Sequence, residues 1–447
     1  MHQQLDVWLL QQRVGTLTRV EGLLSFSYAP EWLARKATGG IYGASKVPLS
    51  QSLPERIETF DDRASRPYFA GLLPEGNKRH VIARVLHVSE KNDFGLLDGI
   101  GGECAGAVTF LEQGQQPASA DAPNEVRWLD NTELLRQLEE LPKRPMLAGE
   151  DGIRLSLAGA QDKLPVVVDL VAPSIRFGLP LKGTPSSHII KPPISGVEGS
   201  VFNEGFCMRL AAELKLDVAK TFIHRTGEML FLVVQRYDRR QINTGNNENI
   251  KLGRLHQEDF CQALGVVPEA KYQNEGGPDL EQIFSLVKRT TRPSAPNTLR
   301  LIDFVIFNAL IGNHDAHAKN FSLLYTEKGA VLAPLYDALS TAVYPNLNEK
   351  MAMKIGSKYK FADLQARHWE QFATAASLSP AQVRKRVLNI AGRLPNLAKS
   401  LQAKMEMEGF GHKVLGDVVQ LIEQRCAVTE RRFSSAHPTQ SEGQTAD

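Results

Sequence analysis

Cysteine is scarce in this chain of 447 residues, and its few cysteines stand far apart. None of them lies in a C-x-x-C pair; they are Cys104, Cys207, Cys261 and Cys426. Zinc knuckles need paired cysteines, and small disulfide-stabilised domains need many of them. The sequence therefore predicts neither a zinc knuckle nor a disulfide framework, and it favours a reducing compartment.

Long apolar runs and an excess of charge of one sign are also missing. No stretch approaches the roughly 18 apolar residues that a membrane-spanning helix needs, and the first residues lack the basic start of a secretory signal. We therefore expect a cytoplasmic protein. The formal net charge is only +2, so no long-range field indicates that the whole molecule binds nucleic acid.

What the chain does contain is typical of folded globular proteins, with 42% hydrophobic and 23% charged residues. Its length exceeds what one hydrophobic core usually serves, so two or three packed units are expected. We predict an α/β subdomain over 1–111, a linker over 112–124, a β-rich unit over 125–240 and a helical unit over 241–433. The polar residues 434–447 are expected to be a disordered tail.

Hydrophobic periodicity predicts the main elements. Short strands at 5–9 and 22–28 are expected to flank turns near Gly15 and Gly22. The other strands are expected at 105–111, 163–170 and 188–193, and as a hairpin around Gly227. The polar residues 243–249 are interpreted as a crossover. Helices are expected at 131–141, with Asn131 as its cap, and at 202–216, 299–311, 362–374, 380–403 and 413–431.

A loop of small residues precedes the strand expected at 163–170. Ala158, Gly159 and Ala160 lack bulky side chains, so their backbone N–H groups could approach phosphate oxygens. Gln161 or Lys163 could add further donors. An ordinary turn before a strand has the same composition, so this loop alone does not identify a phosphate site.

Lys191 places a charged group in the otherwise apolar strand HIIKPP. Glu204, in the first turn of the helix expected next, could pair with it as the strand lysine and helix glutamate of protein kinases do. Two structural alternatives remain open at this point. Lys191 could protect an edge strand from aggregation, and Glu204 could stabilise a helix N-terminus.

The second strand of the expected hairpin ends in Gln235, Arg236, Tyr237 and Asp238. This place would join the β-rich unit to the helical unit, where a kinase hinge offers backbone groups to adenine. The alternative is a charged and exposed strand end.

The strongest local pattern is IGNHDAHAKNFSLL, which follows the buried helix expected at 299–311. Asp315 and Asn320 have the D-x-x-x-x-N spacing of kinase catalytic loops. There the aspartate accepts the proton of the substrate hydroxyl and the asparagine binds magnesium. Asp337, in LAPLYDALS, resembles the second metal ligand of kinases, although Ala338 departs from the D-F-G motif.

Two other interpretations of this loop are open from the residues alone. Asp315 could be a turn or capping residue. His314, Asp315 and His317 could instead belong to a metal-dependent phosphohydrolase, because imidazole and carboxylate groups suit such centres. The second interpretation leaves Lys191 without a role.

In their order along the chain, these segments resemble the HipA family of bacterial serine/threonine kinases. The similar segments are YAPEWLA, GLLPEG, CAGAVTF, SLAGAQDKLP, HIIKPP, FNEGFCMRLA, LVVQRYDR, RLHQEDFCQALG, GNHDAHAKNFSLL and LAPLYDALST, and they span most of the chain. The resemblance implies an α+β fold: a two-lobed atypical protein-kinase-like fold with a mixed α/β N-terminal part and an all-α C-terminal lobe.

The resemblance also implies an activity and partners. It implies a toxin that uses ATP and Mg²⁺ to phosphorylate a protein, with glutamyl-tRNA synthetase as the expected substrate, and that causes growth arrest and persistence. A HipB-like helix-turn-helix antitoxin is the implied partner, with this chain as co-repressor on operator DNA. A catalytically silent co-repressor is the alternative. Arg384, Lys385 and Arg386 could touch DNA phosphates, although a solvated helix face also explains them.

By motif, the resemblance assigns Asp315 as catalytic base, Asn320 and Asp337 as magnesium ligands, and Ser156 as an autophosphorylated serine. A phosphate on Ser156 would add roughly two negative charges beside the phosphate loop, which predicts that the loop is expelled and the enzyme silenced. Gln235 stands where the family has an acidic residue, so the adenine contact there is expected from the backbone. The implied ATP-binding residues are Ala158, Gly159, Ala160, Gln161, Asp162, Lys163, Lys191, Gln235, Arg236, Tyr237, Gln257, His317, Ala318, Lys319, Asn320, Tyr336, Asp337, Ala338 and Leu339.

Overall fold

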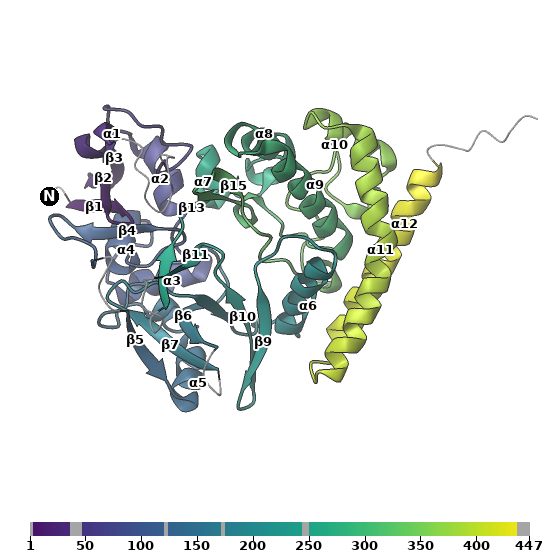
Figure 1. Ribbon diagram of the computed structural model, residues 1–447, viewed down its shortest axis with the longest axis horizontal. Helices are drawn as coiled ribbons and strands as arrows, with labels where there is room; N and C mark the ends of the chain where they lie inside the picture. The colour runs from purple at the N-terminus through teal and green to yellow at the C-terminus, as the bar shows by residue number, and fades with distance from the viewer. Residues whose placement is uncertain (1–2, 36–46, 120–123, 171–174, 244–249, 436–447) are drawn as a thin grey trace, which may run out of the picture.

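The computed structural model describes residues 3–35, 47–119, 124–170, 175–243 and 250–435. Figure 1 shows the N-terminal strands at one end of the molecule and two long helices, α11 (Pro380–Met407) and α12 (Lys413–Ser435), at the other. A second sheet lies between them. Within the described part of the chain, no helix is long and apolar enough to cross a membrane.

The N-terminal subdomain is built on a four-stranded antiparallel sheet of order β3-β2-β1-β4. Its strands are β1 (Gln3–Leu9), β2 (Gln12–Val20), β3 (Leu23–Tyr28) and β4 (Val108–Glu112). Phe26, Phe69 and Phe110 pack in its core, with Phe69 supplied by helix α2 (Asp62–Ala70). The turn predicted near Gly15 is wrong, because Gly15 lies inside β2. A side chain there would come 2.2 Å from the carbonyl oxygen of Ser27.

The central sheet has six strands in the order β5-β7-β6-β8-β10-β9. The hairpin expected around Gly227 is confirmed as β9 (Thr221–Thr226) and β10 (Met229–Gln235). The other four strands are β5 (Glu125–Leu129), β6 (Leu164–Asp169), β7 (Arg176–Leu181) and β8 (His188–Lys191). The strands predicted around Lys191 and after the small-residue loop are therefore present, whereas β5 and β7 were not predicted.

Three local predictions in this part are wrong. The cap of helix α5 (Asn131–Glu140) is Asp130, whose side chain accepts a hydrogen bond from the backbone N–H of Glu133. Helix α6 begins earlier than expected (Ser200–Glu213), so Glu204 lies beyond its first turn. Strands β11 (Arg239–Asn243) and β12 (Ile250–Arg254) pair as an antiparallel hairpin, not a crossover. The connecting residues 244–249 lie outside the described residues.

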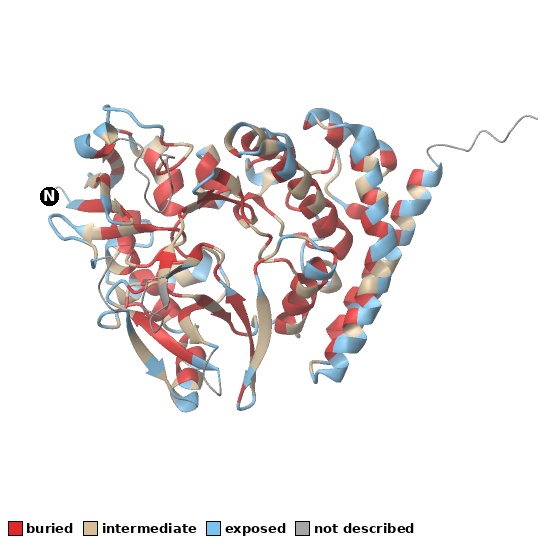
Figure 2. Ribbon diagram, viewed as in Figure 1, coloured by how far each residue is buried: buried red, intermediate tan, exposed pale blue. Residues whose placement is uncertain are grey.

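The C-terminal lobe is mainly helical, as expected. The buried helix of the prediction is α9 (Ser294–Ile311), which Figure 2 shows buried along most of its length. The predicted helices after it are confirmed as α10 (Ala366–Ala375), α11 and α12. Helix α12 continues to Ser435, and residues 436–447 of the predicted tail lie outside the described residues. The remaining α-helices are α1 (Pro30–Ala34), α3 (Gly76–Val85), α4 (Asp93–Ile100), α7 (Phe260–Leu264) and α8 (Leu280–Thr290).

The expectation of an all-α C-terminal lobe is wrong in one respect. Strands β13 (Gln257–Asp259), β14 (Ser322–Thr326) and β15 (Gly329–Leu332) form a small antiparallel sheet there. These strands are too short for periodicity to identify them. They matter for the site, because β13 ends at Asp259 and β14 directly follows the loop that carries Asp315 and Asn320.

Candidate active site

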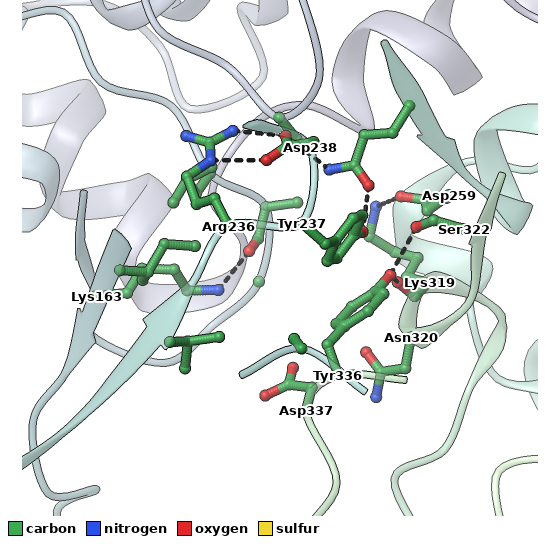
Figure 3. Close-up of a pocket in the computed structure, with 18 of the residues that line it drawn as sticks. Lys163, Arg236, Tyr237, Asp238, Asp259, Lys319, Asn320, Ser322, Tyr336 and Asp337 are labelled. Atoms are coloured by element: carbon green, nitrogen blue, oxygen red, sulfur yellow. Dashed lines mark hydrogen bonds and ion pairs between the residues drawn. The ribbon is translucent and has the colours of Figure 1, made fainter. Parts of the chain in front are cut away.

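A cleft with an internal volume of about 160 Å³ lies where the N-terminal subdomain, the central sheet and the C-terminal lobe meet. Figure 3 shows its polar lining, with Lys163 on one side and Tyr336 and Asp337 on the other. Of the residues implied to bind ATP, the cleft is lined by Ala158, Gly159, Lys163, Lys191, Gln235, Arg236, Tyr237, Gln257, Lys319, Asn320, Tyr336 and Asp337.

Lys191 is the central cation of the cleft. Its Nζ lies 2.6 Å from Glu204 Oε1 and also forms an ion pair with Asp337. Strand β8 lies between β6 and β10, so Lys191 is not on an edge strand and the anti-aggregation interpretation is wrong. The interpretation of Glu204 as a helix N-terminal charge is wrong too, because its carboxylate binds Lys191.

Lys191 and Glu204 of this ion triad are buried, whereas the side chain of Asp337 is 33% exposed. Each charge is stabilised by the opposite charges beside it. Burial opposes the charge on Lys191, but Asp337 and Glu204 raise the pKa of the lysine above its ordinary value. Burial likewise opposes ionisation of Asp337, yet Lys191 and Lys163 keep the pKa of that carboxyl well below its usual range. For Glu204, burial prevails and raises the pKa. Asp337 also adopts a left-handed backbone conformation with φ of 59°, which is uncommon for a residue other than glycine.

The small-residue loop is held by an internal contact with Lys163. Lys163 Nζ donates a hydrogen bond to the carbonyl oxygen of Ala158 over 2.6 Å, and burial in the cleft lowers the pKa of this lysine to about 8. Gly159 has φ of +107°, and a side chain there would come 2.8 Å from Lys163 Nζ. Asp162 turns away to pair with Lys78, and neither Ala160 nor Gln161 lines the cleft.

The end of β10 forms the back of the cleft. The side chain of Arg236 turns away from the cavity and binds Asp238 over 2.8 Å and Glu103 over 3.2 Å. Arg239 and Arg254 also bind Glu103, and despite its burial these three arginines keep the pKa of Glu103 well below its usual range. The interpretation of Arg236 and Asp238 as an exposed strand end is therefore wrong.

Two tyrosines line the cleft beside this strand end. The rings of Tyr237 and Tyr336 lie with their centroids 5.5 Å apart. Tyr237 donates a hydrogen bond to Gln257, and the hydroxyl of Tyr336 donates to the carbonyl oxygen of Lys319 over 2.8 Å. They form an aromatic wall next to the backbone of 235–237, which suits a flat heterocycle.

The loop with the kinase spacing follows α9, which ends at Gly312 in a left-handed conformation. Asn320 donates a hydrogen bond from Nδ2 to the carbonyl oxygen of Asp315 over 2.8 Å, so the two residues are joined within the loop. The hydroxyl of Tyr272 lies 2.5 Å from Asp315 Oδ1 and donates to it. Asp315 does lie in a turn, as one interpretation expected, but its carboxylate also binds the side chain of a distant segment, which a local turn or capping role does not explain. Burial raises the pKa of Asp315, and the Tyr272 hydrogen bond opposes that rise.

The histidines of this loop have separate neighbours. His314 lies 2.9 Å from the carbonyl oxygen of Asn348 through Nδ1 and 3.0 Å from Arg425 through Nε2, so both ring nitrogens are engaged. His317 packs edge-on against Tyr272, and burial lowers its pKa to about 3. Among the residues that the structure describes, no three His, Cys, Asp or Glu side chains gather as a metal site. The phosphohydrolase interpretation thereby loses its proposed ligand set.

The remaining positions of the implied ATP site lie mostly in or near the loop that carries Asp315 and Asn320. Lys319 Nζ lies 2.6 Å from Asp259 Oδ2 and donates to the carbonyl oxygen of Gly71 over 3.1 Å. Ala318 and Ala338 are fully buried. These two residues, with His317 and Leu339, do not line the cleft.

The donor set at one end of the cleft fits a magnesium ion. Figure 3 shows Asn320 and Asp337 at the same end of the cavity. A carboxylate and an amide oxygen are hard ligands of the kind that Mg²⁺ binds, usually together with waters and substrate phosphates. These are the two residues that would hold the ion.

Several lining residues were not predicted. Gly71, Leu72 and Ala105 come from the N-terminal subdomain, and Ile189 and Val234 supply apolar surface from the central sheet. The segment GLLPEG contains Gly71 and Leu72, but its pattern carries no chemistry that would point to a nucleotide. Only its position in the fold assigns it to the cleft.

The basic residues of α11 have mainly structural contacts. Arg386 pairs with Asp303 over 2.6 Å, and Arg384 donates to the carbonyl oxygen of Phe433 over 3.2 Å. Lys385 is exposed. The reading of 384–386 as a phosphate-contacting patch is therefore not supported for the two arginines.

Comparison with known proteins gives consistent matches. The model of the HipA N-terminal domain matches residues 5–111, and that of the HipA-like C-terminal domain matches residues 155–398. The chain is 45% identical over 389 residues to "Putative kinase Y4mE" of Sinorhizobium fredii, covering 86% of this chain and 89% of that protein. It is 29% identical over 398 residues to "Serine/threonine-protein kinase toxin HipA" of Shewanella oneidensis, covering 86% and 87%.

A solved structure shares the fold. It contains the HipA and HipB toxin–antitoxin proteins of Shewanella oneidensis with their operator DNA. The matched chain superposes with a TM-score of 0.80 at 24% sequence identity, covering 98% of this chain and all of that one. The α+β, kinase-like fold expected from the sequence is thereby confirmed.

Proposed function

The chain belongs to the HipA family of kinase toxins, and from this premise we propose that it is an ATP-dependent serine/threonine-protein kinase with Asp315 as catalytic base. The observation that carries the proposal is the ion triad of Lys191, Glu204 and Asp337. A strand lysine paired with a helix glutamate, beside the metal-binding aspartate, is the arrangement that protein kinases require for phosphoryl transfer.

ATP would lie in the cleft with its adenine against the backbone of 235–237 and the aromatic wall. Its phosphates would lie between the loop 158–163 and Lys191. Mg²⁺ bound by Asn320 and Asp337 would neutralise charge on the phosphate oxygens. The further implied ATP contacts of Gln257 and Lys319 belong to the same proposal, since both line the cleft.

The chemical step follows from this placement. The oxygen of the acceptor hydroxyl forms a bond to the γ-phosphorus, and the bond from that phosphorus to the bridging oxygen of ADP breaks. The hydroxyl proton passes to the carboxylate of Asp315. Tyr272 occupies Oδ1 of this carboxylate, so Oδ2 is the oxygen that would accept the proton.

A labelling experiment tests the kinase activity. We expect wild-type protein with Mg²⁺ and γ-labelled ATP to transfer phosphate to itself and to glutamyl-tRNA synthetase. Asp315→Asn should lower the rate by about 1,000-fold, in the range that general-base catalysis contributes, while ATP affinity is kept. Asp417→Asn, at an exposed position of α12, is the matched control and should transfer phosphate normally.

The same experiment separates the alternatives. If the wild type binds ATP but labels neither protein, the catalytically silent co-repressor becomes the better description. Transfer to other proteins of a lysate, with none to the synthetase, would keep the kinase and discard that substrate.

We also propose Ser156 as a site of autophosphorylation. Its hydroxyl is fully buried and donates to the carbonyl oxygen of Leu72 over 2.9 Å, so the loop must move outward before a phosphate can be added. A phosphate would not fit back among buried neighbours, which supports the predicted silencing. Mapping of the label to tryptic peptides tests this, since absence of label from the peptide with Ser156 would exclude it.

As partner we propose a HipB-like helix-turn-helix antitoxin, through which the chain would act as co-repressor on operator DNA. The support is the fold shared with the chain in the HipA–HipB–operator complex. Co-purification with such a protein encoded beside this chain, followed by a gel-shift assay on the adjacent promoter, tests it. No change in the antitoxin's shift on adding this chain would contradict the co-repressor role.

A further inference from the structure

We propose that residues 71–78, here called the clamp segment, are a positioning element that holds the phosphate loop 156–163 against the catalytic lobe, with the Lys78–Asp162 ion pair as its critical contact. The clamp segment belongs to the N-terminal subdomain. Its consequence for ATP affinity rests on the proposed kinase function, whereas its effect on the loop does not.

The clamp segment contacts the phosphate loop at several points along its length. The carbonyl oxygen of Leu72 accepts the Ser156 hydroxyl over 2.9 Å. The backbone N–H of Glu75 donates to the carbonyl oxygen of Gly159 over 3.2 Å, beside a parallel bridge between Pro74 and Gly159. The two chains therefore run side by side.

The ion pair closes this contact at the far end. Lys78 Nζ lies 2.5 Å from Asp162 Oδ1, and the side chains are only 15% and 19% exposed. Water and salt screen a pair at this depth less than an exposed one. Gly159 adopts a positive φ, and its neighbours Ala158 and Ala160 carry no side chain that could anchor the loop, so contacts with the clamp segment help to fix where this part of the loop lies.

The opposite side of the clamp segment is fixed to the catalytic lobe. The carbonyl oxygen of Gly71 accepts a hydrogen bond from Lys319, next to Asn320. Glu75 Oε2 lies 2.8 Å from Lys271 Nζ, and Lys271 precedes the tyrosine that binds Asp315. The clamp segment thus contacts the phosphate loop, the loop that carries Asn320, and Lys271 beside the tyrosine that binds Asp315.

This arrangement gives the N-terminal subdomain a task in the proposed reaction. The loop N–H groups can cradle phosphates only while the loop lies inward, and the clamp segment holds it there. A phosphate on Ser156 would replace the hydroxyl hydrogen that is donated to the carbonyl oxygen of Leu72, so the proposed autophosphorylation would break one of the clamp contacts.

Three variants test the clamp. Lys78→Met removes the cation, and Lys78→Asp combined with Asp162→Lys exchanges the two charges. Lys91→Met, an exposed lysine of the same subdomain, is the matched control. Hydrogen exchange of residues 156–163 reports on the loop without any nucleotide, and calorimetry with ATP and Mg²⁺ reports on affinity.

We expect amide exchange in 156–163 to become about tenfold faster in Lys78→Met, since loss of one part-buried charge pair shifts a local opening equilibrium by about that factor. ATP affinity should weaken by a similar factor, and the KM for ATP should rise with little change in kcat. The charge-swapped double variant should return hydrogen exchange and ATP affinity most of the way to their wild-type values. Lys91→Met should change neither.

The proposal would be overturned if hydrogen exchange of residues 156–163 were unchanged in Lys78→Met. It would also be overturned if the charge-swapped double variant showed hydrogen exchange as fast as that of Lys78→Met. If exchange responds as expected but no variant, nor the wild type, binds ATP, the clamp stands and the proposed kinase function fails. If a variant lost the far-ultraviolet circular dichroism of the folded protein and its amide hydrogens exchanged faster over the whole chain, the defect would be one of folding. That result would count against a positioning role.

Discussion

At the scale of single residues, Lys191 illustrates how a charge is kept inside a protein. Its side chain is 9% exposed, and its ammonium group faces two carboxylates, one from α6 and one from the segment after β15. A buried charge without a partner costs several kcal/mol, so the three groups depend on one another. The sequence suggested the lysine and its helix partner, but the simultaneous contact with Asp337 is a property of the fold.

Replacement of this lysine separates stability from activity. We expect Lys191→Met to lower the free energy of unfolding by about 3 kcal/mol, because Glu204 is left buried without its cation. Adding Glu204→Gln should restore part of the stability, but phosphate transfer should remain lost in both. Urea unfolding and the labelling assay measure the two effects.

Lys182→Met serves as the control for the Lys191 variants. Lys182 is 71% exposed and its ion pair with Glu125 lies at the surface, so stability and transfer should both stay unchanged. Full recovery of transfer in the double variant would refute a phosphate-binding role for Lys191.

At the scale of elements, the end of α9 places the catalytic loop. The helix is buried along most of its length and stops at Gly312, whose φ of +78° turns the chain toward Asp315. A side chain at this position would come 2.6 Å from Leu421 and 2.7 Å from Ala342. Backbone conformation and close packing therefore both require glycine here.

Alanine at this turn should affect both the fold and the site. We expect Gly312→Ala to destabilise by about 2 kcal/mol or more, through backbone strain and overpacking, and to reduce phosphate transfer by displacing Asp315. Gly276→Ala is the matched control, since Gly276 has φ of +94° with open space around it. It should cost only about 1 kcal/mol. Equal losses in the two variants, by urea unfolding, would mean that packing at Gly312 contributes nothing.

At the scale of the whole molecule, buried polar groups join units that lie far apart in sequence. Glu258, on β13, accepts hydrogen bonds from Ser50 Oγ and Tyr325 Oη over 2.5 Å each and from the backbone N–H of Gln51 over 3.0 Å. Ser50 and Gln51 belong to the N-terminal subdomain, so Glu258 ties that unit to the C-terminal lobe. Burial raises the pKa of Glu258 to about 7.

This shift predicts how stability depends on pH. Between the ordinary pKa of about 4.5 and the folded value of about 7, the folded state holds a proton that the unfolded chain has released, so stability falls as pH rises. The loss should reach about 3 kcal/mol by pH 7.5. Glu258→Gln should remove this part of the pH dependence, which urea unfolding at pH 4.5 and 7.5 would show.

Glu228→Gln is the control for Glu258→Gln, because Glu228 is exposed at the tip of the β9–β10 hairpin and should leave the pH dependence of stability as in the wild type. If Glu258→Gln and the wild type lost stability in parallel between the two pH values, Glu258 would not be the group responsible.

The sequence by itself determined the parts of the protein that are encoded locally. Helices α9 to α12 and the β9–β10 hairpin follow from periodicity over neighbouring residues, and the D-x-x-x-x-N spacing marks Asp315 and Asn320 within one short loop. The short strands β13 to β15 were not predicted, because strands of three to five residues are too short to show a recognisable hydrophobic alternation.

Only the tertiary structure decided which distant groups meet. Lys191 and Asp337 are 146 positions apart, and Glu103 and Arg236 are 133 apart, so no local pattern joins them. The clamp segment at 71–78 reaches the site because the N-terminal subdomain folds back onto both lobes, and Tyr272 reaches Asp315 through the fold of the C-terminal lobe. Such contacts depend on the path of the whole chain, since burial and packing select partners that spacing along the sequence does not specify.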